Sequence, residues 1–367
     1  MPFSCLYPFG PFDTFSHSFL QNPLLALDSD KICLLGAPQV GKTSFALDMT
    51  KHFKNPIYID YNDMRLNKDV LNSWLLKWYL EKKMDLLILD NVEQLDFSLP
   101  KLPKIVLIPS PLSSLKIPQD FSPCYALGLS FKEYVSSFKP NTPKNTLFNR
   151  FLKEGNALDS RFFESHSERE KTLQKQKNIK LAFQAHAPLL AKICAHQSHF
   201  TTAFYLYTQF KKELKISKDT LYKFLHTLEE KHLIFLVPSF ENNKSKLYLY
   251  DFALPYYLTP NPSLLSVFEN MVFLELYKQF PHYKICVQDN GLFILLEDSI
   301  PKIAFIAHVF PTPAFLDKQL AWCNKHSLKS FIISINGASA NHSQTFPKNQ
   351  KHISFIEFSL NLKYILI

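Results

Sequence analysis

The sequence predicts an α/β fold, with a parallel sheet covered by helices in the first part of the chain. Two observations carry this prediction. Residues 36–44, GAPQVGKTS, fit the pattern G-x-x-x-x-G-K-[ST] and lie between an apolar run and a helical segment. Beyond them, short apolar runs alternate with helical segments, which is typical of parallel strands with covered faces.

Residues 36–44 are predicted to form a phosphate-binding loop. Its glycines let the backbone turn tightly and bring N–H groups to phosphate oxygens, and the following helix N-terminus favours an anion. Lys42 is expected to reach the β- and γ-phosphates, and the Thr43 hydroxyl to bind Mg²⁺. The alternative is an ordinary strand–turn–helix with a lysine. The expected nucleotide-binding residues are Gly36, Ala37, Pro38, Gln39, Val40, Gly41, Lys42, Thr43 and Ser44.

The composition is typical of a globular protein. The 367 residues suffice for two or three domains, and 46% hydrophobic with 20% charged residues excludes a disordered chain. The six cysteines form no C-x-x-C pair, the first basic residue is Lys31, and no apolar run reaches transmembrane length. We therefore expect a cytoplasmic protein with no membrane partner. The net charge of +9 permits contact with nucleic acid without establishing it.

Four apolar runs are expected to be the strands of the first domain, namely residues 32–35, 56–60, 85–90 and 104–108. Residues 70–83 have the spacing of a helix. The apolar face expected for this helix consists of Leu71, Trp74, Leu75, Trp78 and Leu80.

The third run carries a second signal, because it ends in Asp90 and matches the Walker B pattern. In that pattern a carboxylate at the end of a strand holds Mg²⁺ through water. Many ATPases of this type place a water-activating glutamate next, but this chain has Asn91. Glu93 is the nearest substitute, with a solvated loop charge as the alternative. Ser110, after the fourth run, is a candidate for contacting the γ-phosphate or the water, with a turn serine as the alternative.

Several segments resemble, in the same order, those of a prokaryotic AAA-type ATPase family whose members carry a restriction-endonuclease-like C-terminal domain. Residues 128–134, GLSFKEY, resemble the family's L-S-F-x-E-F/Y segment, and residues 148–155, FNRFLKEG, resemble its F-x-x-F-L-x-x-G helix. Residues 58–66 resemble its second-strand segment, and residues 268–276 resemble the first helix of its nuclease-like domain. The resemblance covers most of the chain from Lys31 onward and implies binding of ATP with Mg²⁺.

The chain departs from this family in its catalytic residues. Residues 120–125 contain no arginine, where the family has a Gly-Arg pair that could act on a neighbouring subunit. Together with Asn91, this argues against efficient hydrolysis and weakens the expectation of a homo-oligomeric ring. Active nucleases of the related fold gather Mg²⁺ with an Asp and a Glu-x-Lys on adjacent strands, and here residues 292–296 and 303–309 lack them. Since Glu269 alone cannot build that site, we expect the nuclease fold without the activity.

Residues 201–250 are expected to form a winged helix. Helices are predicted at residues 203–214 and 218–231, with Ser217 as the N-cap of the second. Wing strands are predicted at residues 234–237 and 246–250.

The second of these helices is the expected DNA contact, through Lys218 and Lys223, because the corresponding helix enters the major groove in helix-turn-helix proteins. The alternative is an internal adaptor. Glu229 and Glu230 favour the adaptor, since they would repel phosphates.

The expected function is that of an ATP-binding protein, a weak Mg²⁺-dependent ATPase that acts as a nucleotide-gated switch, with DNA as a further partner. The alternative is a non-hydrolysing regulator or scaffold, and an active nuclease is the least favoured reading. The chain is predicted to end in edge strands at residues 353–356 and 360–367. The expected parts are a lead-in (1–30), an AAA-type nucleotide-binding domain (31–155), a helical connector (156–200), a winged helix (201–258) and a nuclease-like domain (259–367).

Overall fold

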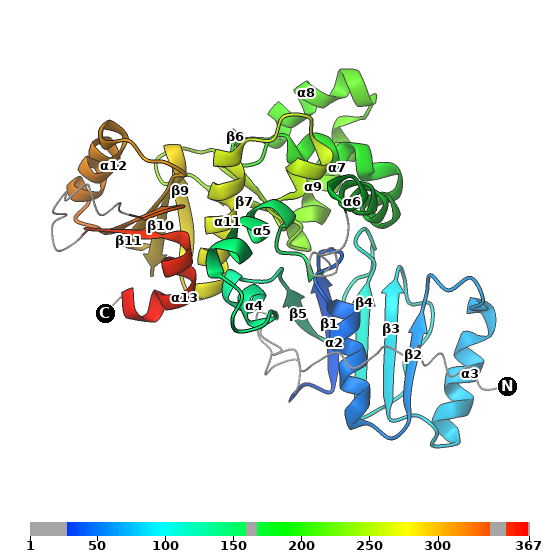
Figure 1. Cartoon of the computed structure of the whole chain (residues 1–367). Coiled ribbons are helices and arrows are strands. Elements are labelled where there is room, and N and C mark those ends of the chain that lie inside the picture. Colours follow the sequence, from blue (N-terminus) through cyan, green and yellow to red (C-terminus); the bar gives the residue numbers. More distant parts are fainter. Residues whose placement is uncertain (1–27, 159–166, 338–349, 366–367) are drawn as a thin grey trace. The chain divides into compact units, whose positions relative to one another are not determined.

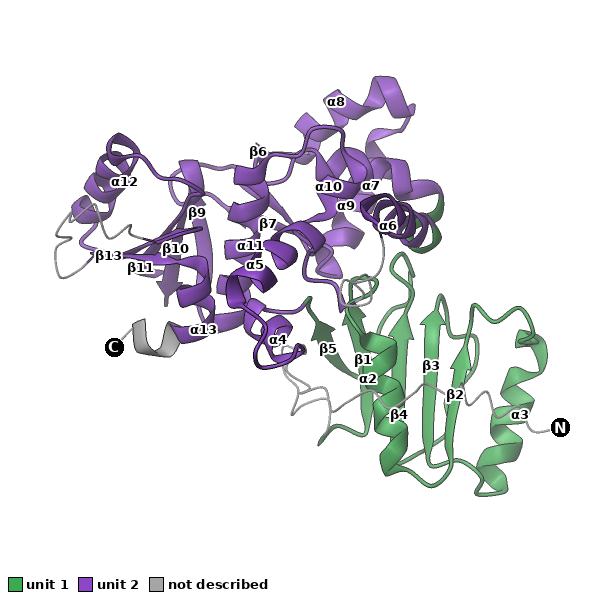
Figure 2. Ribbon diagram, viewed as in Figure 1, with its two compact units in different colours: residues 1–128, 181–184 green, residues 129–180, 185–367 purple. Residues whose placement is uncertain are grey.

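The computed structural model describes residues 28–158, 167–337 and 350–365, so most of the expected lead-in lies outside the described residues. The chain divides into two compact units (Figure 2). Unit 1 comprises Met1–Gly128 and Leu181–Gln184, and unit 2 comprises Leu129–Lys180 and Ala185–Ile367. The division falls after Gly128, whereas the sequence was expected to keep residues 31–155 together.

Unit 1 is built on a five-stranded parallel sheet of order β2-β3-β4-β1-β5 (Figure 1). The α/β class and the four expected strands are confirmed. The strands are β1 (Lys31–Gly36), β2 (Pro56–Asp60), β3 (Leu86–Val92), β4 (Lys104–Pro109) and β5 (Ser122–Ala126).

Strand β5 was not predicted, because Pro123 interrupts the apolar pattern. Proline removes a backbone donor and is tolerated in a sheet mainly on edge strands. Strand β5 is such an edge, since β1 is its only partner among the described strands.

Two helices accompany this sheet, α2 (Lys42–Met49), followed by a 3₁₀ turn η2 (Thr50–His52), and α3 (Lys68–Leu80). Leu71 and Leu75 of α3 join a core that contains residues of β1 to β4. The expected apolar face was wrong at Leu80, which is 70% exposed. Leu80 lies nine residues after Leu71, which is two and a half turns at 3.6 residues per turn, so it points to the opposite side.

Unit 2 contains a second five-stranded sheet, of order β13-β12-β11-β10-β9. The pairs within β9-β10-β11 are antiparallel and those within β11-β12-β13 are parallel. The elements are β9 (Lys284–Gln288), η5 (Asp289–Gly291), β10 (Leu292–Glu297), β11 (Ile300–Ala307), β12 (Lys329–Ser334), β13 (Gln350–Ser354), α11 (Leu264–Gln279), α12 (Pro313–Lys325) and α13 (Phe355–Ile365).

The two faces of this sheet are covered by different helices. Leu316, Leu320 and Cys323 of α12 pack on one face. On the other face, Phe305 of β11 contacts Phe358 of α13. The expectation of a strand at residues 360–367 was wrong, because the segment from Phe355 is helical. A short apolar run does not distinguish a buried strand from a buried helix.

The remainder of unit 2 is mostly helical, with a small antiparallel sheet of order β6-β8-β7. The two helices and two strands expected between residues 201 and 250 are present. The elements are α4 (Phe131–Ser136), α5 (Lys144–Glu154), α6 (Glu168–Phe183), η4 (Gln184–His186), α7 (Ala187–Cys194), β6 (Phe200–Thr201), α8 (Ala203–Leu214), α9 (Lys218–Glu230), β7 (Ile234–Pro238), β8 (Ser245–Leu249) and α10 (Leu254–Leu258).

Helix α6 lies within the expected helical connector and buries one of its faces, although its sequence is highly charged. Lys175 and Asp251 are each only 1% exposed in their side chains and form an ion pair at 3.4 Å. Lys171 likewise pairs with Glu154 at 2.7 Å. One lysine face of α6 is therefore buried against carboxylates that are distant in sequence.

Candidate functional site

The loop of residues 37–41 joins the end of β1 to the start of α2 at the carboxyl edge of the parallel sheet in unit 1. Gly41 is the N-cap of α2, with a φ of 97° that favours glycine. Gly41 has no side chain that could cap the helix, and no acidic residue lies in the first turn of α2. An anion can therefore approach the positive end of the helix dipole.

Gly36 closes β1 in a conformation that other residues rarely adopt, with a φ of 132°. A Cβ atom at this position would overlap the carbonyl oxygen of Ala126 on the neighbouring strand β5. The first glycine of the motif is therefore required by the close approach of two backbones as well as by the turn.

Lys42 folds back over the loop. Its Nζ donates hydrogen bonds to the carbonyl oxygens of Gly36 at 2.8 Å and Ala37 at 2.6 Å. The side chain is largely buried. Its ammonium group thus lies against the loop backbone, where it can exchange these carbonyl oxygens for those of a phosphate.

Thr43 and Asp90 are brought together, as the two sequence signals required. The Thr43 hydroxyl donates to Asp90 Oδ2 at 2.6 Å, which joins the start of α2 to β3. Asp90 is 2% exposed, and burial raises the pKa of its carboxyl, although hydrogen bonds from Thr43 and Tyr58 oppose the rise. A hydroxyl and a carboxylate in contact are the kind of oxygen ligands that Mg²⁺ prefers.

Two residues of β2, Tyr58 and Asp60, belong to this site and were missed. The Tyr58 hydroxyl donates to Asp90 Oδ2 at 3.0 Å, and Asp60 is the register partner of Asp90. The charge of Asp60 is one cause of the raised pKa of Asp90. The sequence held a clue to Asp60, because this aspartate closes the apolar run of residues 56–60. The carboxyl ends of parallel strands lie at the same edge of a sheet, so Asp60 and Asp90 could have been expected at one edge.

Asn91 links the two carboxylates. It interrupts the pairing of β3 with β4 and has a φ of 56°, which asparagine tolerates better than most residues. Its side-chain amide donates to Asp60 Oδ1 at 2.9 Å, and its backbone N–H donates to Asp90 Oδ1 at 2.8 Å. An amide here orients Asp60, whereas a glutamate would repel it.

The two candidate catalytic residues, Glu93 after β3 and Ser110 after β4, differ in burial and in their contacts. Glu93 is exposed, and its carboxylate has no hydrogen bond or ion pair with any described residue. Ser110 is half-buried, and its backbone N–H donates to the Val92 carbonyl at 3.1 Å. The structure thus brings Ser110 to the end of β3 but does not join the Glu93 side chain to Asp90.

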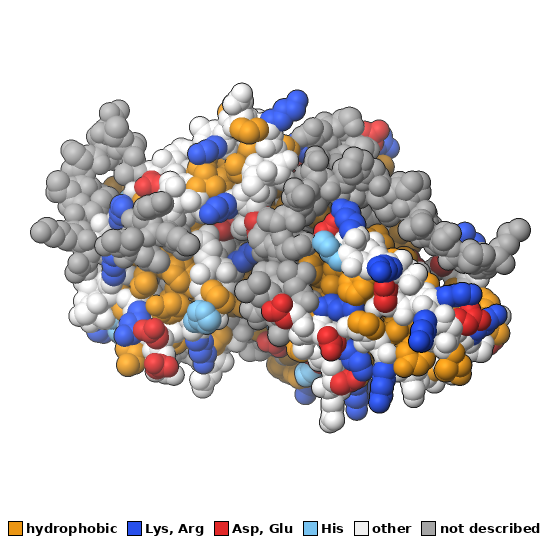
Figure 3. Space-filling view, turned by 90° about the horizontal axis from the view of Figure 1, so that it is seen from below, with side chains coloured by type: hydrophobic (Ala, Val, Ile, Leu, Met, Phe, Trp, Pro, Cys, Tyr) orange, Lys and Arg blue, Asp and Glu red, His pale blue; other side chains and the backbone are white. Residues whose placement is uncertain are grey.

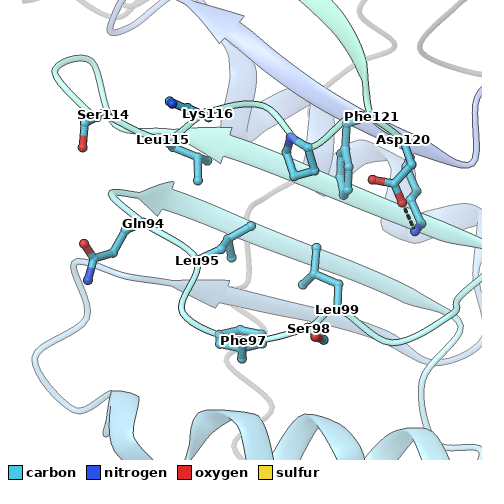
Figure 4. Close-up of a pocket in the computed structure, with 12 residues that line it drawn as sticks. Gln94, Leu95, Phe97, Ser98, Leu99, Ser114, Leu115, Lys116, Asp120 and Phe121 are labelled. Atoms are coloured by element: carbon cyan, nitrogen blue, oxygen red, sulfur yellow. Dashed lines mark hydrogen bonds and ion pairs between the residues drawn. The ribbon is translucent and has the colours of Figure 1, made fainter.

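A cavity of about 550 Å³ opens on unit 1 between the chain segments that follow β3 and β4 (Figure 4). Phe97 and Leu99 approach it from one segment, and Leu115 and Phe121 from the other. No residue of the 36–44 loop lines it, and neither does Asp90. The cavity is therefore separate from the cluster around Asp90.

The residues expected to contact DNA lie on an exposed part of unit 2. Ser217 caps α9 by accepting from the Thr220 N–H at 3.1 Å, as predicted, and Lys218 and Lys223 are both exposed. The Lys218 ammonium lies 5.3 Å from the centre of the Tyr222 ring. Figure 3 shows the molecule from below, and among the coloured side chains on that face basic ones are interspersed with acidic and apolar ones.

Glu269 of α11 is buried, and its carboxylate is bound by two side chains of β8. It forms an ion pair with Lys246 at 2.6 Å and accepts from the Tyr248 hydroxyl at 2.7 Å, and both partners lie on β8. Among the described residues, no group of three or more His, Cys, Asp or Glu side chains could hold a metal ion.

No protein-family model matches the chain, and no curated protein matches it. No helix in the described ranges is both long and apolar enough to cross a lipid bilayer. We therefore infer the function from the contacts of Lys42 and Asp90.

Proposed function

We propose that the chain binds ATP with Mg²⁺ at the loop of residues 36–44 and is a weak ATPase that acts as a switch. The contact between Thr43 and Asp90 carries this proposal, because it joins the two parts of the motif from separate elements. The uncapped start of α2 and the position of Lys42 over the loop support it.

In this proposal the residues have distinct tasks. Backbone N–H groups of the loop and the start of α2 hold the phosphates, and Lys42 moves from its carbonyl partners to the β- and γ-phosphates. Thr43 and Asp90 would hold Mg²⁺, with Tyr58 fixing the orientation of Asp90. The ion, when bound, neutralises charge on the phosphates.

We further propose that the chain contains a P-loop AAA-type domain, a winged helix and a restriction-endonuclease-like domain, with DNA as a partner. The strand order β2-β3-β4-β1-β5 supports the first of these, since the motif loop follows an inner strand. Helices α8 and α9 with strands β7 and β8 support the second. The γ-phosphate would then bias how these domains pack.

Thermal unfolding in the presence of MgATP tests the binding site. A ligand at one hundred times its Kd stabilises the folded protein by about 2.7 kcal/mol, which raises the Tm. We expect this increase for the wild type and its loss in Lys42→Ala. An equal increase in both proteins would contradict the assignment.

A second function, ATP binding without hydrolysis, is favoured by one observation. The position after Asp90 holds an amide, and the Glu93 carboxylate is exposed rather than bound to the site. Phosphate release separates the two functions. If the wild type binds ATP but releases phosphate no faster than Lys42→Ala does, the protein is a non-hydrolysing regulator.

A further inference from the structure

We propose that Asp60 is the carboxylate that activates the attacking water when ATP is hydrolysed. This inference rests on the proposed function, because it assigns a residue to the reaction at the same site. It replaces the expectation that a residue after Asp90 in the chain performs this role.

The placement of Asp60 follows from the sheet. Asp60 and Asp90 are register partners in the parallel pair of β2 and β3, and neighbouring strands lie about 4.8 Å apart. Side chains two residues apart on a strand share a face, so Asp60 lies on the face of Tyr58, which contacts Asp90. Ile59 points to the other face, into the core with α3. Asp60 thus faces the side on which Thr43 meets Asp90.

The two carboxylates differ in what they can reach. Asp90 is buried, and its Oδ2 accepts hydrogen bonds from Thr43 and Tyr58. Asp60 is half-buried and accepts from the Asn62 N–H and from the Asn91 amide, each at 2.9 Å. Both of these bonds end on Oδ1.

Oδ2 of Asp60 therefore has no hydrogen-bond donor among the described residues, and it can accept one from water. Asn91 occupies the position after the Walker B aspartate, where many ATPases have a glutamate. Its side-chain amide fixes the orientation of the Asp60 carboxylate. An asparagine cannot take a proton from water, but it can hold a neighbour that does.

In the proposed step, Asp60 accepts a proton from water as the water oxygen forms a bond to the γ-phosphorus. The bond between the γ-phosphorus and the bridging oxygen breaks, and its electron pair stays on the oxygen of ADP. The proton on Asp60 then passes to solvent or to phosphate. No oxidant or reductant takes part, and the products are ADP and inorganic phosphate.

Single-turnover phosphate release with saturating MgATP, alongside calorimetric measurement of ATP affinity, tests this assignment. General-base catalysis contributes about 10²- to 10⁴-fold, so we expect Asp60→Asn to lower the release rate by at least about 100-fold. The ATP affinity is expected to change less than about threefold. Asp60→Glu, which keeps a carboxylate, should retain part of the rate. Asp63→Asn, a nearby aspartate paired with Arg65 at the protein surface, is the matched control and should leave the rate unchanged.

A positioning variant makes the test independent of Asp60 itself. Asn91→Gly accommodates the positive φ but removes the amide on Asp60 Oδ1, so the rate should fall while the ATP affinity stays.

Four results would overturn the inference while leaving ATP binding intact: an unchanged rate in Asp60→Asn, an unchanged rate in Asn91→Gly, loss of the rate in Glu93→Gln instead, or a wild type that binds ATP without releasing phosphate. A wild type that does not bind ATP would overturn the proposed function first.

Discussion

Glu275 in helix α11 places a carboxyl group in an unfavourable environment, and removing its charge should stabilise unit 2. Its side chain accepts the backbone N–H of Phe131 and the amide of Gln279, yet the residue is only 3% exposed. Burial raises its pKa from an ordinary value of 4.5 to about 7. Glu275→Gln keeps an acceptor for the Phe131 N–H and carries no charge.

The magnitude follows from the pKa values. Between pH 4.5 and about 7 the unfolded chain loses the proton that the folded protein keeps, so stability falls as the pH rises and levels off above 7. At about 1.4 kcal/mol for each tenfold change in proton affinity, the total loss is about 3 kcal/mol. We expect Glu275→Gln to be more stable than the wild type by about 3 kcal/mol at pH 8, and the difference to vanish near pH 4.5.

Urea unfolding followed by tryptophan fluorescence can report unit 2 alone. The chain has three tryptophans, and Trp74 and Trp78 both lie in unit 1. In a background with both changed to phenylalanine, Trp322 is the single reporter. A difference in unfolding free energy between Glu275→Gln and its parent that stays constant from pH 5 to pH 8 would show that folding does not raise the pKa of Glu275.

Three further predictions concern other positions. Asp90→Asn should raise the Tm without Mg²⁺ at neutral pH, since the raised pKa of Asp90 means that folding opposes its ionised form, and MgATP should then raise the Tm no more than ATP without Mg²⁺ does; an unchanged response to MgATP in a melting experiment would contradict this. Gly155→Ala should cost about 2 kcal/mol or more in urea unfolding, because its φ is 90° and a Cβ would overlap the Asp251 carboxylate; unchanged stability would show that the contact relaxes. Lys218→Ala should weaken binding of a labelled DNA duplex in fluorescence anisotropy. It should also lower the slope of log binding constant against log salt concentration by about 1. If the wild type binds no duplex at low salt, DNA is not a partner.

Much of unit 1 could be predicted because its signals are local in the sequence. The four apolar runs identify strands, and the loop motif places Lys42 and Thr43 at the start of a helix. Asp90 was found because it closes such a run. The residues that surround it depend instead on which strands are neighbours, and no local pattern states that β2 lies beside β3. The bonds of Tyr58 to Asp90 and of Asn91 to Asp60 therefore came only from the structure.

Two features of unit 2 could not be predicted from the sequence, because each depends on contacts with residues that are distant in the chain. Lysines are ordinarily exposed, but Lys175 of α6 is buried because it forms an ion pair with Asp251, which lies 76 residues away in the sequence. The apolar end of the chain predicted a strand, while α13 packs Phe355 and Phe358 at helical spacing against other aromatic rings. A long-range partner decided the outcome in both cases.

Isothermal titration of the protein with ATP, with and without Mg²⁺, is the most direct test of nucleotide binding at residues 36–44. We expect saturable binding to the wild type that Mg²⁺ strengthens, loss of binding in Lys42→Ala, and loss of the Mg²⁺ effect alone in Thr43→Ala. Binding that is the same in all three proteins, or no binding to the wild type, would contradict a MgATP site at this loop.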